Sequence, residues 1–149
     1  MRLEDEIHQK KFLNESAKLA VNLIFTYNWL NQRQTAFFKQ FGITPQQFNI
    51  LRILRGMGGK PASVKLLRER MLDKMSDASR IVEKLRLKGL LERKVNSVDR
   101  RACDVVITEK GMQLLSVIDI EVSLFDQVFT GLEEKDKHLM NDLLDRLRG

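Results

Sequence analysis

The sequence contains few of the residues that build disulfide, metal or catalytic sites. Its 149 residues include one cysteine, two histidines and two prolines. A single Cys103 excludes an internal disulfide framework and suits a reducing cytoplasm. His8 and His138 lie at opposite ends of the sequence, so they form no evident metal or nucleophile cluster with Cys103. We therefore expect no catalytic residues, no metal site and no cofactor.

Long apolar runs are also absent. No segment approaches the ~20 apolar residues that span a bilayer. The first residues, MRLEDEIHQKK, alternate in charge and lack the apolar stretch of a signal peptide. Gly56-Met57-Gly58-Gly59 resembles a helix end and lacks the strand that precedes a phosphate-binding loop. These features predict a cytoplasmic protein that is not an enzyme.

The basic charge is concentrated in the middle of the chain. Residues 60–110 contain 14 Lys and Arg against 8 Asp and Glu, whereas the rest of the chain has 12 of each. The net charge of +6 therefore belongs to one third of the sequence. Such a confined surplus favours a polyanionic partner such as DNA. A solvated basic face without a partner is the alternative.

Both ends of the chain predict long helices. Neither proline nor glycine interrupts residues 4–41, where apolar residues recur at near-helical spacing. One or two helices over this span would reach up to ~50 Å, so part of the apolar stripe is expected to pack on another chain. The alternative is that both ends wrap the core of a single monomer.

The middle of the chain reads as two short helices after a capped one. Thr44-Pro45-Gln46-Gln47 has the pattern of a capping box with proline at the first helical position. Ser63 is expected to open the next helix, and Ser76 to cap the one that follows. Gly89 then suits the left-handed position after a helix end. A short turn over residues 72–75 is expected to join these two helices. Two short helices joined by a turn of this length form a helix-turn-helix.

A strand pair is expected immediately after this helix. Residues 91–95 and 103–107 are rich in Val, Ile and Leu and flank a polar-leaning loop over 96–102. Thr108 is expected to cap a helix over 109 to about 129. Thr130-Gly131-Leu132-Glu133 has a capping-box pattern for a last helix. We expect one mainly α domain, 1–149, with a small β-hairpin wing.

Three ordered motifs resemble the MarR family of bacterial winged-helix transcription regulators. They are Ser79-Arg80-Ile81-Val82-Glu83-Lys84-Leu85 followed by Lys88-Gly89-Leu90-Leu91-Glu92-Arg93, then Asp99-Arg100-Arg101, then Ile107-Thr108-Glu109-Lys110-Gly111. The resemblance implies a winged helix-turn-helix head over about 44–110 and dimerisation helices over 1–41 and 112–149. It also implies a homodimer on pseudo-palindromic promoter DNA, usually a repressor, often released by a small ligand.

The helix-turn-helix geometry nominates the DNA-binding residues. The N-terminal part of the second helix meets base edges in the major groove. Here those residues are Ser76, Asp77, Ser79 and Arg80, with Lys84 one turn further as a phosphate contact. Arg80 can recognise a guanine bidentately or contact phosphate alone.

Three more contacts are expected outside that helix. Ser63 begins the first helix of the pair, where it can hold a phosphate. Arg100 or Arg101 is expected to enter a minor groove, with Asp99 orienting one guanidinium. A simple surface ion pair is the alternative at this loop.

Effector binding and redox sensing are less determined by the sequence. Tyr27, Trp29 and Phe48 could line a cleft, although their helical spacing favours burial in the core. Cys103 is expected to be a small apolar strand residue rather than an oxidant sensor. A helical dimer that binds a protein or a ligand, with a wing not used on DNA, is the alternative function.

Overall fold

The computed structural model describes residues 1–96, 98, 103–121 and 127–149, and the structural statements below concern these residues. Asp99, Arg100 and Arg101, together with residues 122–126 of the predicted long helix, lie outside them. The described chain is mainly helical with a small three-stranded sheet, which confirms the predicted fold class. Its order is α1 Leu3–Glu6, α2 Glu15–Lys39, α3 Pro45–Gly56, β1 Ala62–Ser63, α4 Val64–Arg70, α5 Ala78–Leu87, β2 Leu91–Val95, β3 Cys103–Ile107, α6 Glu109–Glu121 and α8 Glu134–Arg148.

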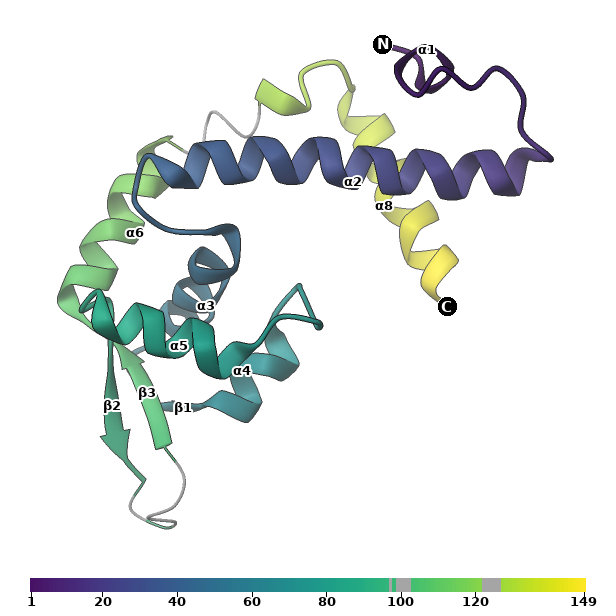
Figure 1. Ribbon diagram of the computed structural model, residues 1–149. Coiled ribbons are helices and arrows are strands. Elements are labelled where there is room, and N and C mark those ends of the chain that lie inside the picture. Colours follow the sequence, from purple (N-terminus) through teal and green to yellow (C-terminus); the bar gives the residue numbers. More distant parts are fainter. Residues whose placement is uncertain (97, 99–102, 122–126) are drawn as a thin grey trace.

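The molecule has a long upper helix and a head beneath one end of it (Figure 1). Helix α2 runs along the top, and α3, α4, α5 and the sheet lie below its C-terminal end. The β2–β3 hairpin projects at the bottom of the head, away from α2 and α8. This arrangement exposes the hairpin for contact with a partner.

The N-terminal region divides into two helices of very unequal length. The predicted span 4–41 is broken between Glu6 and Glu15. His8 has a φ of 54°, and the Asn14 side chain caps α2 by accepting the Ala17 N–H at 2.8 Å. The Asn14 cap, which was not predicted, explains why α2 starts later than expected.

The capping box of α3 is present as predicted. The Thr44 hydroxyl accepts the Gln47 backbone N–H at 3.1 Å, and the side-chain Oε1 of Gln47 accepts the Thr44 N–H at 3.2 Å. Gln47 is buried, and its Oε1 also accepts a hydrogen bond from the Lys88 ammonium at 3.1 Å. The cap thus joins the start of α3 to the end of α5.

The antiparallel sheet has the order β1-β3-β2. Both predicted strands of the hairpin are confirmed over 91–95 and 103–107, with Leu91 opposite Ile107 and Val95 opposite Cys103. The two-residue β1, which pairs Ala62 with Val105, was not predicted. Two residues give no periodic signal, so this strand appears only through its partner.

One hydrophobic core holds the head together. It combines the end of α2 with α3, α4, α5, the sheet and α6. Burial of these side chains supplies the main stabilisation of the head. The largest fully buried members are Ile50, Leu51, Leu54, Leu67, Met71, Leu85, Leu91, Val105, Leu115 and Ile118.

The helices outside the head are much more exposed. Helix α8 has no buried residue, and its Leu143 is 49% exposed. Tyr27 on α2 is 60% exposed, so its predicted burial is wrong for this single chain. Phe48 is half-buried against Phe38, with ring centroids 4.3 Å apart, and Trp29 is half-buried beneath the Arg33 guanidinium.

The C-terminal capping box occurs three residues later than predicted. The N-cap of α8 is Glu133, whose backbone N–H donates to Asp136 at 3.2 Å, rather than Thr130. The Thr130 hydroxyl instead donates to the Gln127 carbonyl at 3.0 Å. Within the described residues, no helix is both long and apolar enough to cross a membrane.

Candidate nucleic-acid interface

The turn before α5 is organised by Asp73. Its carboxylate accepts the Ser76 hydroxyl at 2.6 Å and the Met75 N–H at 3.0 Å. These hydrogen bonds, that from Ser76 foremost, hold the pKa of Asp73 below its usual value. The Ser76 hydroxyl is therefore committed to the turn and does not cap the helix.

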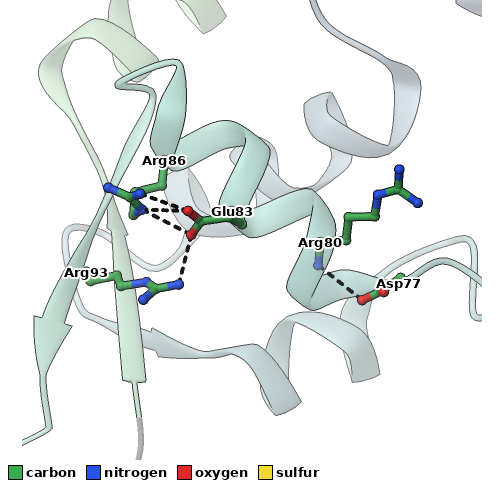
Figure 2. A network of polar contacts seen from close by, with 5 residues as sticks. All are labelled: Asp77, Arg80, Glu83, Arg86 and Arg93. Atoms are coloured by element: carbon green, nitrogen blue, oxygen red, sulfur yellow. Dashed lines mark hydrogen bonds and ion pairs between the residues drawn. The ribbon is translucent and has the colours of Figure 1, made fainter.

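Asp77 caps α5 in place of Ser76. Its backbone is extended, and its carboxylate accepts the Arg80 N–H at 3.1 Å (Figure 2). The predicted N-cap was thus wrong by one residue. A carboxylate at this end also complements the positive end of the helix dipole.

One face of α5 is buried and the other is exposed. Ala78, Val82 and Leu85 are buried and pack into the core. Ser79, Arg80 and Lys84 are exposed on the remaining surface. Figure 2 shows the Arg80 guanidinium pointing away from the Asp77 carboxylate. Among the described residues, neither Arg80 nor Lys84 forms an ion pair, so both charges are available to an anionic partner.

Ser63 caps the preceding helix, as predicted. Its hydroxyl accepts the Leu66 N–H at 3.1 Å, and its backbone pairs with Asp104 of β3. Helices α4 and α5 pack against each other through the core, as expected for a helix-turn-helix. This helix pair and its capping turns therefore contain six of the predicted DNA-binding residues: Ser63, Ser76, Asp77, Ser79, Arg80 and Lys84.

The outer ends of the two hairpin strands lie among the described residues, whereas residues 97 and 99–102 do not. The Asn96 side-chain amide donates to Asp104 at 3.0 Å and so joins the ends of the two strands. The side-chain Oδ1 of Asn96 accepts the Val98 N–H at 2.9 Å. The predicted contacts of Asp99, Arg100 and Arg101 fall just beyond these strand ends and outside the described residues.

A carboxylate on α5 links the helix to the hairpin. Glu83 accepts hydrogen bonds from Arg86 at 2.8, 3.0 and 3.3 Å and from Arg93 on β2 at 2.8 Å (Figure 2). The hydrogen bond and charge of Arg86, with the charge of Arg93, lower the pKa of Glu83. This cluster was not predicted from the sequence. The Glu83–Arg86 spacing is a recognisable signal for an intrahelical pair, but nothing local indicates Arg93.

The end of α5 is also tied to the helices that lead out of the head. The Lys88 ammonium donates to the Gly42 carbonyl after α2, and the Lys110 ammonium of α6 donates to the Lys88 carbonyl at 3.0 Å. Gly89 has a φ of 71° and ends α5 as predicted. The orientation of α5 is therefore fixed at its C-terminal end as well as at its cap.

No metal centre is evident in the described part of the chain. Within residues 1–96, 98, 103–121 and 127–149, no three His, Cys, Asp or Glu residues form a group that could hold a metal ion.

Comparisons with known proteins identify the family of this chain. A family model described as "MarR family" matches residues 41–102. The chain is 30% identical over 127 residues to a candidate transcriptional regulatory protein for the hcr operon of Thauera aromatica, covering 79% of this chain and 75% of that protein. It is 28% identical over 134 residues to the HTH-type transcriptional regulator MhqR of Bacillus subtilis, covering 89% and 91% of the two chains.

Solved structures share the fold at lower identity. An organohalide-sensing transcriptional regulator in its 2,4-dichlorophenol-bound form aligns with a TM-score of 0.81 and 20% identity, over 91% of this chain and 80% of the other. MepR of S. aureus, solved in complex with DNA, aligns with a TM-score of 0.71 and 17% identity, over 86% and 92%. The predicted winged-helix resemblance is confirmed: the chain belongs to the MarR family of transcriptional regulators.

Proposed function

We propose that this regulator is a homodimeric repressor that binds a pseudo-palindromic promoter site and is released by a small ligand. The observation that carries the proposal is the exposed face of α5, which bears Arg80 and Lys84, on the same head from which the hairpin projects (Figure 1). A helix with this exposure fits the major groove, and a hairpin beside it reaches the flanking backbone or minor groove. The DNA complex of MepR, which has the same fold, supports this mode of binding.

The division of the chain supports a dimer with two reading heads. Residues of about 44–110 would form the DNA-binding head, and 1–41 with 112–149 the dimerisation region. Helix α8 exposes Leu139, Met140, Leu143 and Leu147, a stripe that a second copy would cover. Two heads related by a two-fold axis fit half-sites about one helical turn apart.

Release by a ligand is supported by one relative and one cavity. The regulator solved with 2,4-dichlorophenol has the same fold. In the present chain, an open cleft of about 450 Å³ lies among the turn after α2, the end of α5 and α6. Lys88, Lys110 and Leu114 are among its lining residues, whereas Tyr27, Trp29 and Phe48 are not. A DNA-binding role also implies a cytoplasmic location, on the nucleoid when bound.

A charge-matched pair of variants tests the DNA-binding face. Arg80→Gln with Lys84→Gln should lower affinity for duplex DNA more than 10-fold in a fluorescence titration. The control, Lys135→Gln with Lys137→Gln, removes the same charge from exposed ion pairs on α8. Equal losses in the two variants would mean that net charge alone governs binding and would contradict the proposal.

The wing requires its own variant because its tip was assigned from sequence alone. Arg100→Gln with Arg101→Gln should also lower DNA affinity more than 10-fold while the dimer remains intact. An unchanged affinity would remove the wing from the interface and favour a role in protein binding.

A further inference from the structure

The outer part of β2 is weakly anchored to the head. Leu91 is buried, but the next four residues of the strand are all exposed. Beyond Leu91, β2 is therefore held by its backbone pairing with β3 rather than by core packing. Strand β3 is itself anchored by buried Val105 and Val106 and by its pairing with β1, so β2 is an edge strand whose side chains beyond Leu91 add no core packing.

One side-chain contact ties this edge strand to α5. Arg93 lies in the middle of this exposed stretch, opposite Val105 of β3, and its Nη2 donates to Glu83 Oε2 at 2.8 Å. In the part of the chain that the structure describes, this is the one hydrogen bond or ion pair between the four outer β2 residues and α5. It fixes the strand that leads to the wing against the helix that faces the groove.

The contact between Glu83 and Arg93 contributes more to the orientation of β2 than to the free energy of folding. The Glu83 and Arg93 side chains are 40% and 55% exposed, so the ion pair itself adds little to folding. Arg86, which lies on α5 itself, donates three hydrogen bonds to the same carboxylate, and one of them goes to Oε2, the oxygen that also accepts from Arg93. Of the two arginines, only Arg93 joins Glu83 to another element, the strand β2 (Figure 2).

On electrostatic grounds alone, the negative charge of Glu83 would weaken DNA binding at this surface. A carboxylate on the exposed side of a DNA-reading helix repels phosphate, and its loss would raise the affinity for DNA. Its presence is explained if it has a geometric task that outweighs the repulsion. We propose that Glu83 and Arg93 are positioning residues that set the angle between α5 and the wing, so that both enter adjacent grooves together. This inference rests on the proposed DNA-binding function.

An electrostatic role and a positioning role of Glu83 predict opposite changes in DNA affinity when its charge is removed. Glu83→Gln makes the protein more positive, so a purely electrostatic role predicts tighter binding to DNA. A positioning role predicts at least a 5-fold loss of affinity, because the wing contacts are misaligned. Glu92→Gln is the matched control, since Glu92 pairs with Lys94 within β2 and bridges no two elements. It should leave affinity unchanged or slightly raised.

Arg93→Gln and Arg86→Gln provide a second matched pair. Each removes one positive charge from the same carboxylate, but only Arg93 joins β2 to α5. In DNA-free protein, Arg93→Gln and Glu83→Gln should speed hydrogen exchange of the 94–96 and 103–104 amides, and Arg86→Gln should not. The double variant Glu83→Gln/Arg93→Gln restores the wild-type net charge, and its affinity should match that of the weaker single variant rather than the wild type.

The decisive experiment combines these variants with hydroxyl-radical footprinting on a duplex selected by the wild type. Positioning predicts that Glu83→Gln and Arg93→Gln lose protection at the flanking wing positions and retain it at the central major-groove positions. Uniform weakening, or equal footprints for Arg93→Gln and Arg86→Gln, would overturn the inference and leave DNA binding intact. Failure of the wild type to bind any duplex would instead refute the proposed function, and the inference with it.

Discussion

The guanidinium of Arg55 on α3 donates two hydrogen bonds to the carboxylate of Asp119 on α6, at 2.6 and 3.3 Å. The two residues are 64 positions apart, and their side chains are 28% and 49% exposed. This bidentate pair joins the head to the helix that leads toward the C-terminal region. It is a direct polar link between the two proposed parts of the molecule.

Breaking this pair should have a small effect on stability. Because both side chains are partly solvated, Asp119→Ala is expected to lower the free energy of unfolding by about 0.2–1 kcal/mol. Urea unfolding of Arg55→Ala, Asp119→Ala and the double variant measures the coupling. Strictly additive effects would show that the contact does not link the head to α6.

Gly111 is predicted to tolerate a side chain far less well than Gly56 does. A Cβ at this position would lie 2.3 Å from the Leu90 carbonyl oxygen and 2.7 Å from Ile107 Cγ1. Gly111→Ala should therefore cost about 1–3 kcal/mol, since α6 would have to move off the strand and turn. Gly56→Ala is the control, because a Cβ there meets nothing within 4 Å and the φ of Gly56 is not positive. Thermal unfolding that shifted equally in both variants would contradict this packing.

Gly111 is part of a family motif in the sequence, but the close packing that requires a glycine there is visible only in the structure. The same distinction between local pattern and distant contact applies to the rest of the chain. Local signals were sufficient for the cap at Thr44, the stop at Gly89 and both strands of the hairpin. Each of these depends on residues within a few positions of one another, which is what periodicity and capping rules describe.

Features that depend on distant partners or competing hydrogen bonds were missed. Ser76 was expected to cap α5, but the side chain of Asp73 captures its hydroxyl, so the cap passes to Asp77. The link from Arg93 to Glu83 and the strand β1 both need three-dimensional information. The sequence thus names candidate residues, which remain a prediction, but not the hydrogen bonds that connect them.

The turn before α5 should weaken in acid. The folded pKa of Asp73 is lowered, so its hydrogen bonds stabilise the native state above the ordinary carboxyl value of 3.8. That contribution is lost as the pH falls below this value, through the folded pKa. Asp73→Asn should be less stable than wild type at pH 7, and the difference should shrink toward pH 3. A pH-independent difference in chemical unfolding would exclude the charged state of Asp73 as the cause.

The apolar stripe of α8 should control association. Leu143 is half-exposed in the single chain and lies between Leu139 and Leu147 at helical spacing. Leu143→Asp is expected to convert a dimer to a monomer in sedimentation equilibrium, because a buried unpaired carboxylate is costly. Arg146→Ala on the same helix should leave the dimer intact. A wild-type protein that is monomeric at tens of micromolar would contradict the proposed dimerisation region.

The most direct test of the account is selection of bound duplexes from a random DNA pool by the full-length protein, followed by sequencing. We predict enrichment of an inverted repeat with half-site centres about 10 bp apart. Affinity for that site should fall with salt at a logarithmic slope of about 0.9 per phosphate contacted. Weak, salt-sensitive retention without any enriched sequence would contradict the proposal of a sequence-specific dimeric repressor.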